Sequence, residues 1–181
     1  VGWLLAVASL CEAGASGLTT LTSPEMKYTV SSRPYVILKR ADVEAVVVDN
    51  SAVDDEILPG HRAGYSGIGL LRHVRRRENL FVPAYAGLNF EHIHDGTTQD
   101  RKVLYEPRNA PMQLRLIDEH TAELYQPPTP HWRLESCIRY ALLPDGVIEM
   151  TLECIPRAQT YKHSYIGLFF GRLIKAGVSR Q

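Results

Sequence analysis

The chain has 181 residues, of which 45% are hydrophobic and 22% charged, a composition typical of one globular domain that needs no disulfide or metal to fold. Its 20 basic and 20 acidic side chains cancel. This balance argues against nucleic-acid binding, which draws its affinity from neutralising phosphates. Residues 72–77 (RHVRRR) are a local exception, typical of a solvated loop or, as the alternative, of an anion contact.

The first 25 residues differ from the rest. Residues 3–11 (WLLAVASLC) form an apolar run followed by small residues, as in a secretory signal, but the run is too short to span a membrane. Alternatively, Met26 is the true start. We therefore expect an extension over 1–25 and a single domain over 26–181. The first interpretation predicts a secreted or periplasmic protein, the second a cytoplasmic one.

The next part of the chain predicts short strands, because prolines and glycines interrupt every apolar run and no long helical pattern is present. Residues 43–49 (VEAVVVD) are almost continuously apolar, as in a strand buried on both faces. Residues 50–65 are polar and predict a long loop. The other expected strands are 27–32, 35–40, 67–73, two strands within 79–94 that are separated at Pro83, and 102–106.

Two hairpins are predicted in the second half. In the first, Ile117 faces Thr121, which places Leu114 opposite Leu124 and Arg115 opposite Glu123.

The second hairpin turns at Pro144-Asp145-Gly146, where proline suits the first turn position and glycine the left-handed one. With Leu143 facing Val147, one face becomes largely apolar and the other largely polar. This register places Cys137 and Cys154 on opposite faces, so we expect no disulfide between them. For Cys137, beside Arg139, a surface thiol is favoured over a thiol of lowered pKa.

Together these elements predict an all-β fold, an antiparallel β-sandwich. Residues 161–174 contain a last apolar run (YIGLFF) close to the end of the chain. A sheet ending there would leave an apolar edge, which proteins usually cover. Either the fold closes on itself or the chain is a fragment of a larger sandwich, and the sequence favours the fragment.

The segment 88–95 (LNFEHIHD) is the candidate site. On a strand, His92 and His94 share one face, while Glu91 and Asp95 share the other. Histidine titrates near neutrality, which suits general acid–base catalysis. We therefore predict His92 and His94 as catalytic residues, with Glu91, Asp95 and Arg72 as substrate-binding residues nearby. The alternative is that both histidines only pack.

Two histidines can also share a metal ion, but such a site needs a third ligand. The candidates are His61, His73, His163, Glu91 and Asp95. The pair resembles the His-x-His of cupins, although the glutamate that cupins carry shortly afterwards is missing. The glycines of residues 64–69 (GYSGIG) follow a loop rather than a strand, so they predict a turn or bulge and not a dinucleotide site. We predict no metal and no cofactor.

Aromatic residues are distributed among the expected strands, as on sugar-binding surfaces, although β-sheets are generally rich in tyrosine. They are Tyr65, Tyr85, Phe90, Tyr125, Trp132, Tyr140, Tyr161 and Tyr165.

The stretch from Met112 to Arg157, which contains ELYQPPTPHWRLESCIRYALLPDGVIEMTLECIPR, resembles the middle of the galactose mutarotase-like (aldose epimerase-like) superfamily. The resemblance lies in the rhythm of strand, proline-containing stretch, strand, Asp-Gly turn and strand. It implies an antiparallel supersandwich and carbohydrate chemistry with a histidine acid and a glutamate base, neither of which a motif matches here.

The leading functional prediction is thus a carbohydrate-binding or carbohydrate-modifying protein with a sugar as its ligand. The alternatives are a metal-dependent β-sandwich enzyme that uses the His-x-His pair, and a structural or interaction domain without catalysis.

Overall fold

The structure is a computed structural model that describes residues 18–76, 78–163 and 167–171. These residues form ten strands and two short helices. In chain order the elements are β1 (Thr29–Val30), β2 (Tyr35–Arg40), β3 (Val43–Val48), β4 (Gly67–His73), β5 (Asn89–His94), α1 (Arg101–Leu104), α2 (Glu106–Asn109), β6 (Gln113–Asp118), β7 (Thr121–Gln126), β8 (Leu134–Leu142), β9 (Ile148–Pro156) and β10 (Gly167–Gly171).

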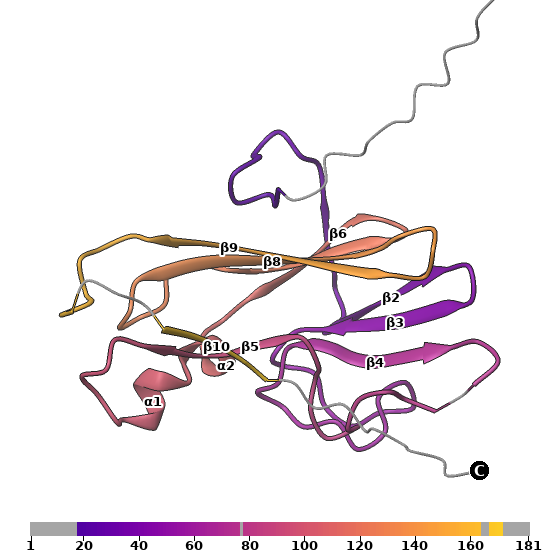
Figure 1. Cartoon of the computed structure of the whole chain (residues 1–181), viewed down its shortest axis with the longest axis horizontal. Coiled ribbons are helices and arrows are strands. Elements are labelled where there is room, and N and C mark those ends of the chain that lie inside the picture. The colour runs from indigo at the N-terminus through magenta and orange to yellow at the C-terminus, as the bar shows by residue number, and fades with distance from the viewer. Residues whose placement is uncertain (1–17, 77, 164–166, 172–181) are drawn as a thin grey trace, which may run out of the picture.

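The strands lie in two layers (Figure 1). One layer is a five-stranded antiparallel sheet in the order β1-β6-β7-β8-β9. The other contains the antiparallel sheet β2-β3-β4 and the antiparallel pair β5-β10, and a bridge between Ile68 of β4 and Gly87, just before β5, joins them. The prediction of an all-β, antiparallel, sandwich-like fold is therefore confirmed.

The β8–β9 hairpin has the predicted register. Tyr140 pairs with Met150, and Cys137 pairs with Glu153. The Leu143 amide donates to the Val147 carbonyl at 2.8 Å, and Gly146 has the left-handed φ of 78° that the turn requires. Turn chemistry and the alternation of the two faces were thus sufficient to fix this element.

The β6–β7 hairpin follows the prediction except at its tip. Leu114 pairs with Leu124 and Arg115 with Glu123, as expected. A bulge then places Asp118, rather than Ile117, opposite Thr121. The Asp118 carboxylate accepts a hydrogen bond from the His120 amide at 2.7 Å, and such a side-chain-capped turn competes with continued pairing.

Strand β3 is buried on both faces, as its apolar run predicted. Val47 belongs to the main core between the two layers. Val46 and Val48 face a second apolar cluster with Leu58 and Leu70, where β3 and β4 pack against the long 50–65 loop. The predicted glycine bulge is also confirmed, because the β3–β4 register shifts at Gly69.

Two expected strands are wrong. Residues 102–106 lie in α1, in α2 and at Tyr105 between them, because the Asp100 side chain caps the Lys102 amide at 2.9 Å and Pro107 suits the first turn of α2. Within 79–94, the structure forms a strand only at Asn89–His94. Strand 27–32 shortens to the two residues of β1.

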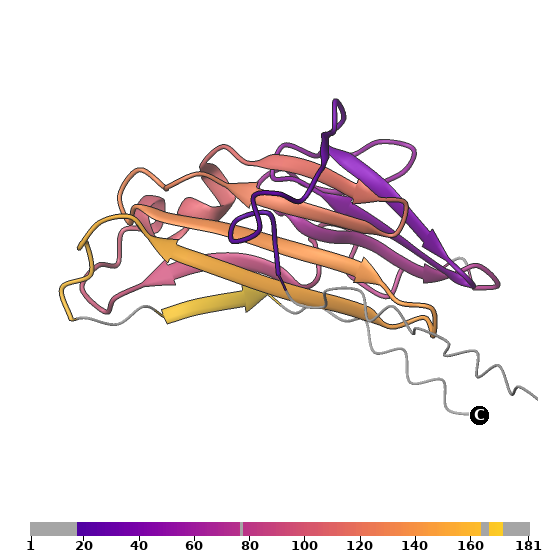
Figure 2. The same ribbon diagram turned by 90° about the horizontal axis from the view of Figure 1, so that it is seen from above.

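The segment 18–26 lies on the outer side of the five-stranded sheet (Figures 1 and 2). The Thr20 hydroxyl donates to Glu123 of β7, and the Thr19 hydroxyl donates to Glu153 of β9, both at 2.5 Å. Residues 18–25 therefore pack on the domain although the sequence predicted a separate extension there. The rest of that extension, residues 1–17, and the expected signal lie outside the described residues.

Candidate functional site

Strand β5 carries the candidate site, and a bulge interrupts its alternation. Phe90 pairs with Phe170 of β10, but the next pair along the ladder joins His92 to Phe169. Glu91 therefore has no partner on β10 and is the extra residue of a β-bulge. A bulge changes the direction of the side chains beside it. The prediction that Glu91 faces away from His92 is thus wrong.

Glu91, His92 and His94 form a continuous chain of polar contacts. Glu91 Oε2 lies 3.3 Å from His92 Nε2, and His92 Nδ1 lies 3.4 Å from His94 Nε2. The Glu91 and His92 side chains are 19% and 24% exposed, so both side chains are partly open to solvent. We refer to these three residues as the β5 relay.

The contacts of the β5 relay are compatible with the following proton arrangement. With Glu91 ionised and both rings neutral, His92 carries its proton on Nε2 and donates it to the carboxylate. His92 Nδ1 then accepts from His94 Nε2–H. A proton added at one end can be passed along this chain, because each atom that accepts is in contact with one that donates. Such an arrangement suits general acid–base chemistry.

Neighbouring residues hold the start of β5 in place. The Asn89 side-chain amide donates to Glu91 Oε1 at 3.2 Å. Leu88, just before the strand, has a positive φ of 50°, and its carbonyl accepts from the hydroxyl of the buried Tyr140 at 2.7 Å. A non-glycine residue in this conformation is held by its surroundings, and such positions concentrate at functional sites.

Tyr105, which lies between α1 and α2, packs edge-on against His92 with ring centres 4.6 Å apart. The Arg108 guanidinium lies 5.0 Å from the Tyr105 ring and 3.9 Å from the Tyr65 ring. Sequence reasoning missed Tyr105, because residues 102–106 read as a strand and nothing in that pattern links them to β5.

Asp95 directly follows β5, and its buried carboxylate stabilises the local fold. It is 1% exposed and accepts hydrogen bonds from the Thr97 hydroxyl at 2.5 Å, the Thr97 amide at 2.9 Å and the Lys162 amide at 3.0 Å. Burial alone would raise the pKa of this carboxyl, but these hydrogen bonds and the nearby His163 lower it to about 2. Asp95 therefore fixes the turn after β5 and joins it to residue 162.

Arg72 does not lie beside the two histidines. It is on β4, where it forms an ion pair with Glu44 at 2.5 Å. Because the bridge from Ile68 to Gly87 is antiparallel, β4 runs away from β5 (Figure 1), and Arg72 is near the far end of β4. The prediction that Arg72 lies near His92 and His94 is therefore wrong.

Within the described residues, no group of three or more histidine, cysteine, aspartate or glutamate side chains could hold a metal ion. The two imidazoles of β5 face one another rather than a common point, with His92 Nδ1 directed at His94 Nε2. The metal-dependent alternative thus gains no third ligand in this part of the chain.

Three of the eight rings expected as sugar platforms pack in the core instead. Phe90, Trp132 and Tyr140 are buried. Trp132 stacks on Tyr161 at 5.2 Å, and its indole N–H donates to the Val103 carbonyl at 2.9 Å. Tyr165 lies outside the described residues.

Cys137 is not a surface thiol. It is buried, with its sulfur 3.4 Å from Glu123 Oε2. Burial in the first place, and the Glu123 charge in addition, raise the pKa of Cys137 to about 12. Burial likewise raises the pKa of Cys154 to about 12. Both cysteines are free, as the hairpin register predicted.

Comparison of the chain with models of protein families, with curated proteins and with solved structures gave no match. The resemblance to the mutarotase-like superfamily therefore stays a prediction. No helix in the described ranges has the length and apolar character that crossing a membrane requires.

Proposed function

We propose that this domain binds a carbohydrate and that the β5 relay moves protons between oxygen atoms of the bound sugar. The observation that carries the proposal is the unbroken contact from the Glu91 carboxylate through His92 to His94. The resemblance noted above implied one glutamate and one histidine for this kind of chemistry, and the bulge supplies a glutamate beside the histidine pair.

The reaction that suits the relay is interconversion of sugar anomers. A base takes the proton of the anomeric hydroxyl, an acid protonates the ring oxygen, and the bond between the ring oxygen and the anomeric carbon breaks as the carbonyl forms. Ring closure on the other face reverses these steps. The relay offers a carboxylate at one end and an imidazole at the other, so that one accepts a proton while the other, once protonated, donates.

Two other functions remain as alternatives with distinct consequences. A metal-dependent enzyme would contain a bound ion, detectable by elemental analysis of the purified protein and sensitive to chelators. A structural or interaction domain would bind neither metal nor sugar, and its two histidines would contribute to packing alone.

Calorimetric titration of the protein with a panel of aldoses and oligosaccharides tests the proposal. We expect saturable binding by the wild type and its loss in the His92→Ala/His94→Ala variant. His73→Ala is the matched control, because His73 is an exposed histidine at the end of β4 and pairs with Asp42. Equal binding by both variants would refute a role for the relay, and absence of binding by the wild type would favour a structural domain.

A further inference from the structure

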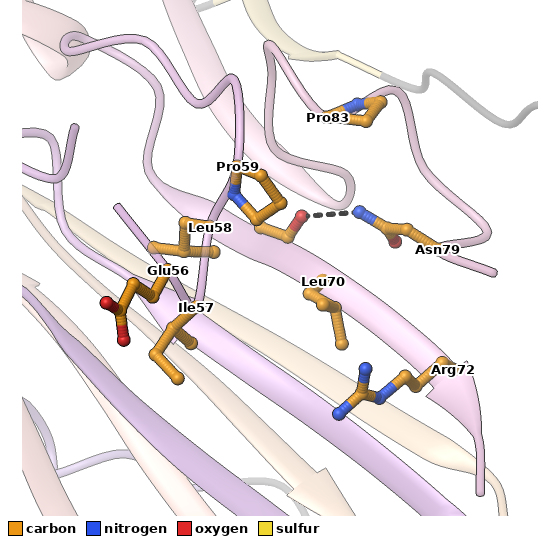
Figure 3. A pocket seen from close by; sticks show the side chains of 9 residues that line it. Glu56, Ile57, Leu58, Pro59, Leu70, Arg72, Asn79 and Pro83 are labelled. Carbon is orange, nitrogen blue, oxygen red and sulfur yellow. Dashed lines mark hydrogen bonds between the residues drawn. The ribbon is translucent and has the colours of Figure 1, made fainter. Parts of the chain in front are cut away.

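A cavity of about 250 Å³ lies on β4, and none of the β5 relay residues lines it (Figure 3). The 56–59 loop forms one wall, and Pro83 and Asn79 lie across from it. Leu70 and Arg72 of β4 form the floor between them. This volume lies just under the lower end, about 300 Å³, of typical small-molecule sites, so it suits a small ligand.

The loop wall of the cavity is held in a defined conformation. One oxygen of Asp55 accepts from the amides of Ile57 and Leu58, at 2.8 and 2.7 Å. Leu58 is buried and packs closely over Gly69, where a Cβ would lie 2.9 Å from the Leu58 side chain. The glycine therefore permits the close approach of loop and strand.

The opposite wall is equally fixed. The Asn79 side-chain amide donates to the Gly69 carbonyl at 2.9 Å, and its oxygen accepts from the Leu71 amide at 3.0 Å. Because these contacts use the polar atoms of Asn79, Arg72 is left as the main polar group of the floor. The cavity is thus shaped before any ligand arrives, which lowers the conformational cost of binding.

The charges around Arg72 favour an anion. Glu44 is buried, and its one carboxylate is shared by Lys39 at 2.9 Å and Arg72 at 2.5 Å. The group Lys39, Glu44 and Arg72 thus has one positive charge in excess, while Glu56 of the loop wall adds a carboxylate to the cavity lining. The Arg72 guanidinium extends over the floor toward Ile57, whereas the Glu56 carboxylate points away from it (Figure 3).

We propose that this cavity binds a small aliphatic carboxylate, with its apolar chain against Leu58, Leu70 and Pro83 and its carboxylate on Arg72. The planar guanidinium matches the two oxygens of a carboxylate, and the apolar walls contribute through the area that they remove from water. The proposal is independent of the sugar site, because it uses none of the β5 relay residues.

Calorimetric titration with butyrate, hexanoate and octanoate tests this proposal, with the alcohol of each chain length as a neutral probe. We expect the carboxylates to bind at least about tenfold more tightly than the alcohols, since a hydrogen bond to a charged group contributes a free energy equivalent to about that factor in affinity. Equal affinity of carboxylate and alcohol in the wild type would overturn the proposal without any variant.

Variants locate the site. Arg72→Met should weaken carboxylate binding about tenfold or more, whereas Arg75→Met should leave it unchanged, because Arg75 is an exposed arginine just after β4 and pairs with Asp42. The His92→Ala/His94→Ala variant should also bind as the wild type does, which separates failure here from failure of the proposed function. Unchanged affinity in a folded Arg72→Met protein would refute the assignment.

Discussion

The Glu91 carboxylate lies 3.3 Å from Nε2 of His92, although the two residues are neighbours on a strand and would normally point to opposite faces. The bulge that leaves Glu91 without a partner on β10 makes this contact possible. It converts a histidine pair into a chain that ends in a carboxylate, and the proposed chemistry depends on it.

The contact should favour one tautomer of His92. We expect the neutral His92 ring to carry its proton on Nε2 in the wild type, because Glu91 accepts it, and to become a mixture of tautomers in Glu91→Ala. Nitrogen chemical shifts of the imidazole rings measure this directly. His73 serves as the internal control, and a His92 tautomer that is the same in both proteins would show that Glu91 does not hold the ring.

Asp95 should make stability depend on acid pH. Its carboxyl has a pKa lowered to about 2 in the fold, so it stabilises the folded state at pH values above its unfolded pKa, and this contribution is lost as the pH falls from about 4 toward 2. Urea unfolding of wild type and Asp95→Asn should therefore differ most near neutrality and converge at low pH.

Asp145→Asn is the control for this comparison, since Asp145 is an exposed turn residue with one long contact, 3.4 Å, to the Val147 amide. Its difference from the wild type should be small at every pH. A constant difference between wild type and Asp95→Asn from neutral pH down to about pH 2 would contradict the account of Asp95.

Cys137 and Cys154 should be unreactive in the folded protein, because burial raises the pKa of each thiol to about 12. In a Cys11→Ser background, we expect negligible labelling by a thiol reagent under native conditions and labelling of both cysteines in denaturant. Rapid native labelling, or a disulfide between the two, would be incompatible with the structure.

The Thr20 hydroxyl links two charges on the outer side of the five-stranded sheet. It accepts from Arg115 Nη1 at 2.7 Å and donates to Glu123 Oε2 at 2.5 Å, and Glu123 is 0% exposed. We expect Thr20→Val to lower the free energy of unfolding by about 1–3 kcal/mol, because it leaves buried polar groups unsatisfied. Denaturant titration measures the change.

Thr22→Val is the matched control, because the Thr22 hydroxyl contacts Glu153 at an exposed position. Its effect should stay within about 0.5 kcal/mol. Equal effects of the two substitutions would argue against a buried link between the 18–26 segment and the sheet.

The sequence predicted those strands whose position depends on a turn motif or on the pattern of apolar residues within the strand itself. The Pro144-Asp145-Gly146 turn set the register of β8 and β9, and the unbroken apolar run of β3 indicated burial on both faces. The predicted strand at residues 102–106 is wrong, because the cap by Asp100 and the proline of α2 outweighed the strand preference of Val103 and Tyr105.

The site was only partly predictable, because distant segments complete it. His92 and His94 were identified from their spacing, but the bulge at Glu91 depends on β10, which follows much later in the chain. Cys137 is contacted by Thr20, which lies in a segment that the sequence predicted as a separate extension. The position of Arg72 depends on the bridge between Ile68 and Gly87, for which the sequence carries no local signal.

The rate of anomer interconversion, followed by polarimetry on freshly dissolved aldoses, tests the central claim most directly. We predict that the wild type and His73→Ala accelerate the reaction of at least one sugar beyond the buffer rate. His92→Ala/His94→Ala should lose about 10²-fold or more of that acceleration, the usual contribution of a general acid–base group. A wild-type protein that leaves every aldose at the buffer rate would contradict the proposed role of the β5 relay.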